Sequence, residues 1–313
     1  MTPSPGSRGL SARLIGQLTL LTVCAIWGGN FIAMHLMLER TGPLDVIFLR
    51  TAIAAAGFIL LLLALRRPVP AFTRAEWTRL GLMGVLGVAV FNVATATGQS
   101  HLPASISSLL VGSSPIFTAI FGAATGVERV GKRTIAAIAL ATAGLAVLVT
   151  WGRGSGVELN RTTLFAAGML LVAPAAWAAY TVLNKPLLAR HPPLEIAAIG
   201  MIVGAAILSP LGVFSPGRLG RIAGLDAVGW GSVLFSAVFS LIVAFILFAR
   251  ALRTLTPSEV AMSTYLTPLF AIFFAWLLLG ERPTPGLVAG GALIVAGIAL
   301  VTTQGVAQPP EEG

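Results

Sequence analysis

The chain has 313 residues, of which 56% are hydrophobic and 10% are charged, and its mean hydropathy is +0.92. A soluble domain carries about a quarter charged residues, so the composition excludes an ordinary soluble protein and indicates an integral membrane protein. The formal net charge of +9 does not indicate a nucleic-acid partner, because the basic residues lie in short clusters between apolar runs. The single cysteine, Cys24, excludes a disulfide framework and a cysteine-based metal site.

Ten apolar segments follow one another along the chain, separated mainly by prolines and charged residues. Each is about long enough to cross the roughly 30 Å of hydrocarbon in a bilayer, where helix is the only open-chain structure that satisfies its own backbone hydrogen bonds. The predicted fold is therefore all-α, with ten transmembrane helices. The end segments, 1–13 and 305–313, are expected to be cytoplasmic tails, the first of them disordered. The predicted spans are 14–37, 44–65, 78–99, 104–125, 131–151, 162–184, 194–214, 228–251, 258–280 and 285–304.

Two stretches of the chain follow one template, in which a proline is followed 13 residues later by a Glu-Arg pair and a glycine lies 16 residues after the glutamate. This pattern predicts an internal repeat of about 150 residues, with one five-helix repeat in 14–151 and a second in 152–304. Because five is odd, the halves must cross the membrane in opposite senses. Inverted repeats of this kind place a substrate site at their interface, near the bilayer midplane. The template residues are Pro115, Glu128 and Gly144 in one copy and Pro268, Glu281 and Gly297 in the other.

The loops differ in their content of Lys and Arg. Thirteen of these residues lie on the side of the N-terminus and seven on the other side, which predicts that both termini are cytoplasmic and that the protein lies in a bacterial inner membrane. A secretory signal peptide is the alternative interpretation of the first segment. The polar residues Trp27, Asn30 and His35 within it argue against that alternative, as does Trp177, its counterpart 150 residues later.

Polar and aromatic residues within the spans form stripes at helical spacing. An unpaired polar group in lipid is costly, so these side chains should face the bundle interior or a wet cavity. Hydrogen bonds that only join helices are the competing interpretation, above all for the serines and threonines. Aromatic rings beside amides would suit a zwitterion with an apolar or aromatic side chain. The candidate substrate-binding residues are Trp27, Asn30, Asn92, Thr95, Gln99, Ser114, Trp177, Tyr180, Asn184, Ser240 and Tyr265.

Arg50, near the start of the second predicted span, allows three interpretations. Its side chain could reach the membrane interface, pair with Asp45, or bind a substrate carboxylate. The glutamates of the template lie at helix ends and are interpreted as structural tethers or gate residues, with a solvated turn as the alternative. The residues assigned a gating or structural role are Arg50, Pro115, Pro268, Glu128 and Glu281.

The stretches 27–31 (WGGNF) and 48–50 (FLR), together with the two Pro…Glu-Arg…Gly units, resemble the EamA-type transporters of the drug/metabolite transporter superfamily. The resemblance covers residues 14–304 and is closest to the branch of the aromatic amino-acid exporters. It implies ten helices, both termini inside, and export of small metabolites, amino acids among them. Because members of one fold carry many substrates, the resemblance does not name the cargo.

No carboxylate pair, metal-spaced histidine cluster or nucleotide loop occurs in the sequence, so neither an enzyme nor a cofactor or metal is expected. We therefore predict a monomeric secondary transporter that exports amino acids, with aromatic or hydrophobic ones favoured, by alternating access. Export of a nucleobase, sugar or drug cation is the alternative within this class, and an intramembrane enzyme is the alternative from another class. The acidic residues near the spans lie at their ends, which favours downhill transport without obligatory proton movement.

Overall fold

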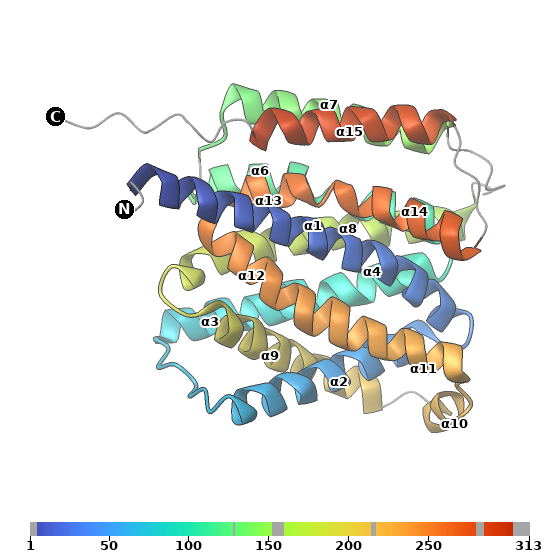
Figure 1. Cartoon of the computed structure of the whole chain (residues 1–313). Coiled ribbons are helices and arrows are strands. Elements are labelled where there is room, and N and C mark those ends of the chain that lie inside the picture. The colour runs from blue at the N-terminus through green and yellow to red at the C-terminus, as the bar shows by residue number, and fades with distance from the viewer. Residues whose placement is uncertain (1–4, 128, 152–159, 214–216, 280–284, 303–313) are drawn as a thin grey trace.

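The computed structural model describes residues 5–127, 129–151, 160–213, 217–279 and 285–302, and these ranges contain helices and no strand. The helices run side by side through the molecule, and the label at the N-terminus lies at one end of the bundle (Figure 1). Seven helical stretches within the described ranges are long and apolar enough to cross a membrane. They are Arg13–Leu38, Pro43–Ala64, Arg74–Gln99, Arg161–Leu188, Pro193–Pro210, Ala227–Thr254 and Pro257–Leu278.

Residues 5–151 form the helices that precede the first long gap in the description. The first helix begins at Pro5, whereas the sequence predicts a disordered tail up to residue 13. Proline is favourable at the first position of a helix, because its fixed φ suits the helix and its missing N–H would have no partner there. The elements are α1 (Pro5–Leu38), α2 (Pro43–Ala64), α3 (Arg74–Met83), η1 (Gly84–Val90), α4 (Phe91–Gln99), α5 (Ala104–Val111), α6 (Ser114–Ala124) and α7 (Lys132–Trp151).

Residues 160–302 form a second series in a similar order. It also contains a short helix, α10, which lies outside the apolar segments and which the sequence analysis does not predict. The elements are α8 (Arg161–Leu188), α9 (Pro193–Val213), α10 (Arg218–Ala223), α11 (Ala227–Leu234), η2 (Phe235–Val243), α12 (Ala244–Thr254), α13 (Pro257–Ser263), α14 (Leu266–Leu279) and α15 (Pro285–Thr302).

Four of the apolar segments are interrupted. The π-helical segments η1 and η2 interrupt Arg74–Gln99 and Ala227–Thr254, and such segments are frequent at functional sites. The other two segments are each divided into two helices by a two-residue turn, a break that lies at residues 112–113 between α5 and α6 and at residues 264–265 between α13 and α14. Pro115 and Pro268 follow these breaks in the first turn of the new helix, where a residue without an N–H is tolerated. The two breaks face each other, because the hydroxyl groups of Ser114 and Thr264 lie 3.3 Å apart.

Glycines allow equivalent helices of the two series to pack closely. Gly57 of α2 faces Ile242 of η2, and Gly204 of α9 faces Val88 of η1. In both places a Cβ on the glycine would overlap the facing side chain, so the packing of α2 on η2 resembles that of α9 on η1. The α7 and α15 helices pack mainly on each other and form a layer at one edge of the bundle (Figure 1).

Candidate functional site: a cavity in the middle of the bundle

A cavity partly open to solvent lies between the two series of helices, with about 70 Å³ of space for the centres of water-sized molecules. Helices α1, α2, α4, α5, α6, α8, η2, α12 and α14 contribute to its lining, and the described residues of α7 and α15 do not. The candidate residues that the structure brings together in the lining are Trp27, Asn30, Arg50, Asn92, Thr95, Gln99, Ser114, Trp177 and Ser240.

Aromatic rings form one wall of the cavity. The rings of Trp27 and Trp177 meet edge to face with centroids 5.2 Å apart, and Phe91 lies 5.1 Å from Trp177. The indole N–H of Trp27 donates to the backbone oxygen of Ser240, 3.2 Å away, which fixes the ring of Trp27 in one orientation. Phe245 contributes a further ring, 5.5 Å from that of Trp177. Edge-to-face arrangements of this kind are favourable for aromatic pairs and leave an apolar surface for a ligand.

Amide side chains form part of the polar lining, and each of them is held by one hydrogen bond within the protein. Asn92 donates through Nδ2 to the backbone oxygen of Val88 (2.7 Å), and Gln99 donates through Nε2 to that of Phe31 (2.8 Å). Asn30 accepts through Oδ1 from the hydroxyl of Ser236 (2.7 Å). These bonds fix the direction of each amide. The Oε1 atom of Gln99 is buried and has no hydrogen-bond partner within the described residues.

Arg50 lies in the cavity lining, and only 5% of its surface is exposed. The interpretation in which this side chain reaches the membrane interface is therefore wrong. The pairing with Asp45 is also wrong, because the carboxylate of Asp45 binds Arg218 and Arg221 through Nε atoms at 2.8 and 2.5 Å. Asp45 and Arg50 are five residues apart on one helix, which turns them about 140° away from each other.

Two candidate residues lie on α8 but outside the cavity lining. Tyr180 stacks on Trp177, with ring centroids 4.8 Å apart, and its ring occupies the space that Gly87 of η1 leaves free. Asn184 lies one further turn along α8 and is completely buried. Its amide atoms have no hydrogen-bond partner within the described residues. The helical stripe on α8 thus begins at the cavity with Trp177 and continues into the packed interior.

The remaining candidates lie at or beyond the helix breaks. The Tyr265 hydroxyl lies 3.1 Å from the Thr142 hydroxyl of α7, so this tyrosine joins the break before α14 to the edge layer and does not line the cavity. Pro115 and Pro268 are buried in the first turns of α6 and α14 and are not part of the cavity lining. Glu128 and Glu281 lie outside the described residues.

Several lining residues are not among the substrate-binding candidates of the sequence analysis. Most are apolar or small, and nothing in the sequence distinguishes them from residues that pack helices together. Thr267 is an exception. The repeat template places Pro268 153 residues after Pro115, and the same offset makes Thr267 the counterpart of the candidate residue Ser114. Helical spacing places one further lining residue, Val111, on the stripe of Ser114, and the lining residues that sequence reasoning missed are Phe31, Phe91, Ser108, Gly112, Leu241, Phe245, Thr264 and Thr267.

The end of the bundle where the N-terminus lies is tied together by polar contacts. Lys185, near the end of α8, donates through Nζ to the backbone oxygens of Leu252 and Leu255, at 2.7 and 2.6 Å. Arg13 of α1 pairs with Glu259 of α13. Below the aromatic wall, the α1 residues Leu20, Val23 and Cys24 are completely buried. This end of the bundle is therefore densely packed, and none of these residues lines the cavity.

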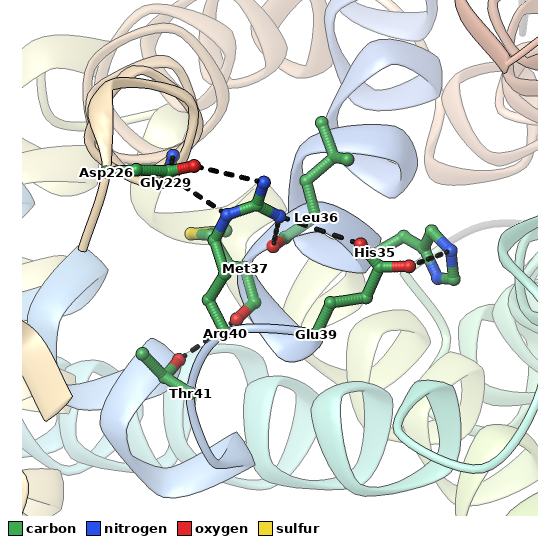
Figure 2. A network of polar contacts seen from close by, with 8 residues as sticks. All are labelled: His35, Leu36, Met37, Glu39, Arg40, Thr41, Asp226 and Gly229. Atoms are coloured by element: carbon green, nitrogen blue, oxygen red, sulfur yellow. Dashed lines mark hydrogen bonds and ion pairs between the residues drawn. The ribbon is translucent and has the colours of Figure 1, made fainter. Parts of the chain in front are cut away.

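The opposite end of the bundle contains a second cavity. It is lined by the last residues of α1 and by residues 99–104, and Gln99 lines both this cavity and the central one. Figure 2 shows a polar network at the same end, in which Arg40 follows α1 and contacts Asp226, just before α11, with Nε 2.9 Å from Oδ1. The hydrogen bond from Arg40, helped by the backbone N–H of Gly229, holds the pKa of Asp226 below its ordinary value.

Comparison with known proteins decides the family. The model of the EamA-like transporter family matches residues 14–150 and again residues 164–303. The chain belongs to the EamA-like transporter family. This EamA-like transporter is therefore a multi-pass integral membrane protein, and its apolar helices and central cavity agree with that assignment.

Relatives of this EamA-like transporter carry different names. A probable terminal-alkyne amino-acid exporter of Streptantibioticus cattleyicolor is 28% identical over 284 residues, which cover 90% of this chain and 91% of the relative. An S-adenosylmethionine/S-adenosylhomocysteine transporter of Chlamydia trachomatis is 29% identical over 296 residues, covering 88% and 85%. One solved structure superposes with a TM-score of 0.74 at 20% identity over 94% of this chain and 96% of that chain, which shows the fold alone.

Proposed function

We propose that this EamA-like transporter exports small metabolites, above all amino acids with aromatic or hydrophobic side chains, by alternating access. The observation that carries the proposal is the central cavity, which lies between two interrupted helices and combines paired tryptophans with fixed amides. Aromatic rings would hold the apolar body of the cargo, and amide and hydroxyl groups would hold its polar head. The probable amino-acid exporter among the relatives supports the same cargo class.

The transport mechanism that we propose uses two inverted halves of five helices each, ten spans in all. Support comes from the family model, which matches the chain twice, and from the equivalent packing of Gly57 and Gly204 on opposite π-helical segments. The hydrogen bond between Ser114 and Thr264, 150 residues apart, joins the two helix breaks beside the cavity. Rocking of one half on the other would open the cavity to each side in turn.

The proposed orientation has both termini in the cytoplasm of a bacterial cell, with the protein in the inner membrane and acting as a monomer. The excess of Lys and Arg on the side of the N-terminus supports it. In this orientation the densely packed end of the bundle faces the cytoplasm, and the second cavity, at the end of α1, faces outward. The structure would then correspond to a state from which the cargo is released. Tags at both termini should be reachable only from the cytoplasmic side.

Proteoliposomes containing the purified chain test the proposal. Vesicles are loaded with labelled phenylalanine, leucine, uracil, glucose or ethidium, and efflux is measured against vesicles without protein. The amino acids should leave faster than the other solutes. Trp177→Ala removes the ring at the centre of the aromatic wall and should slow this efflux, whereas Trp276→Ala, on the exposed face of α14, is the matched control. Faster efflux of uracil, glucose or ethidium than of both amino acids would refute the cargo assignment.

A further inference from the structure

Arg50 is a cation in a part of the structure where charge is costly. It lies seven residues into α2, about 10 Å along the helix axis from Pro43, and is 5% exposed. An arginine at such a position is expensive unless it is paired, and intramembrane charges of this kind mark binding sites or ion pathways. Because Arg50 lines the central cavity, its guanidinium is placed where a bound molecule could reach it.

The guanidinium of Arg50 has no acidic partner within the part of the chain that the structure describes. Its Nη1 atom lies 2.9 Å from the thioether sulfur of Met34, a weak acceptor, and its Nε atom is buried without any hydrogen-bond partner. Asp45, the nearest acid along the helix, is bound by Arg218 and Arg221. The described lining of the cavity contains no aspartate or glutamate. No described residue therefore supplies the countercharge that Arg50 needs, which leaves a place for an anionic group of a ligand.

Two other residues of the lining carry neutral oxygens that lack a hydrogen-bond partner within the described residues. The hydroxyl of Thr95 and the Oε1 atom of Gln99 are buried without a hydrogen-bond partner in the described residues. Gln99 cannot turn its amide freely, because its Nε2 atom donates to the backbone oxygen of Phe31. The cavity thus combines a donor with a full positive charge and acceptors without charge. This combination suits a carboxylate, with or without an ammonium group beside it, and disfavours a cation.

We propose that Arg50 binds a carboxylate group of the cargo, which makes the cargo a small carboxylate or zwitterion; this deepens the proposed function and rests on it. The planar guanidinium can donate two parallel hydrogen bonds to a carboxylate, which gives a strong and directed contact. A carboxylate at this place satisfies the buried Nε atom and neutralises the charge of Arg50. Organic cations are excluded because no acid in the described lining offsets the repulsion from Arg50.

Binding to the purified full-length chain in detergent tests the site without requiring transport. Calorimetry compares phenylalanine with phenylalaninamide, and phenylacetate with phenylacetamide, which differ only at the carboxylate. The wild-type chain should bind each carboxylate at least about 10-fold more tightly than its amide, since hydrogen bonds to charged groups are the strong ones. In Arg50→Gln both ratios should fall to about one, and phenethylamine, which the wild type excludes, should gain affinity.

Two further variants separate the charge at this site from general effects of mutation. Arg50→Lys keeps the charge but not the planar pair of donors, so its ratios should lie between those of the wild type and Arg50→Gln. Arg79→Gln removes an exposed arginine on α3 and should leave the ratios unchanged. The assignment is refuted by amides that bind the wild type as tightly as the carboxylates, by retained ratios in Arg50→Gln, or by a lack of binding of both carboxylates.

The same probes separate this site from the proposed function. If the carboxylates bind in a manner that depends on Arg50 but none of them crosses proteoliposomes, the carboxylate site stands and the export proposal fails. If phenylalanine and its amide are transported at equal rates by the wild type and by Arg50→Gln, transport stands and the carboxylate site is refuted.

Discussion

Removal of the negative charge of Asp45 should destabilise the transporter strongly. The Asp45 side chain is 1% exposed, and Arg218, with Nε 2.8 Å from its carboxylate, is 8% exposed. Breaking a buried pair by removing one partner costs about 3–5 kcal/mol, because the other charge remains buried and unpaired. Arg221 is 39% exposed and adds little, because water screens its interaction. For Asp45→Asn we expect an apparent Tm lower by roughly 6–20 °C, at about 2–4 °C per kcal/mol.

The assay is thermal unfolding of the purified protein in detergent, followed by intrinsic fluorescence. Asp226→Asn is the matched control, because it removes the charge from an exposed ion pair while asparagine can still cap α11. Adding Arg218→Met to Asp45→Asn should restore most of the lost stability, since the orphaned cation is then gone and methionine can pack against Phe48, whose ring lies 4.6 Å from the guanidinium. The reasoning is refuted if Asp45→Asn unfolds no earlier than Asp226→Asn.

Three further predictions follow from other contacts. Arg50→Met should raise the apparent Tm of the empty protein by a few degrees, because replacing an unpaired buried charge with an apolar side chain should stabilise the fold by about 1–4 kcal/mol. A lower Tm would assign Arg50 a structural role. Tyr265→Phe should lower the Tm, because it removes the neutral hydrogen bond to Thr142 of α7, a loss of about 1 kcal/mol. It should leave the affinity for phenylalanine within about twofold, because the Tyr265 hydroxyl does not line the cavity. The Arg40–Asp226 contact should stabilise the fold above the ordinary carboxyl pKa and be lost as the pH falls through the lowered pKa of Asp226, so the Tm difference between wild type and Asp226→Asn should shrink from pH 7 to pH 3.

The positions of the helices could be predicted because apolar length alone determines them in lipid. The segment 44–65 corresponds to Pro43–Ala64, and 228–251 corresponds to Ala227–Thr254. The interruptions were harder to predict. The residues at the breaks, Gly112-Ser113 and Thr264-Tyr265, are of types that also occur inside other helices of this chain, and the clearer sequence signal is the proline that follows each break. The π-helical segments η1 and η2 have no such signal, because an extra residue in a helical turn leaves composition unchanged.

The cavity residues could be predicted only in part. Helical spacing identifies which residues share a face of one helix, but it does not show how that helix is rotated against its neighbours. Helical spacing therefore predicts that Trp177 and Tyr180 both line the cavity. In the structure the Tyr180 ring instead packs against Gly87, in space that a larger residue would fill. Arg50 shows a second limit. A long basic side chain near a helix end can reach either water or the interior, and only the packing around it decides between them.

The charge of Arg50 also bears on how transport is driven. Glu259, the acid that could most easily have reached inward, instead accepts from the backbone N–H of Thr256 at 2.8 Å and pairs with Arg13. Among the described residues no carboxylate is therefore placed to carry a proton through the cavity. An empty carrier must enclose the bare charge of Arg50 each time it changes sides, whereas a carrier loaded with a carboxylate encloses a neutral pair. A penalty of only about 1.4 kcal/mol would slow the empty return tenfold. Exchange of internal for external phenylalanine should thus exceed net efflux at equal pH, and Arg50→Gln should remove the difference; net efflux driven uphill by a pH gradient alone would contradict this mechanism.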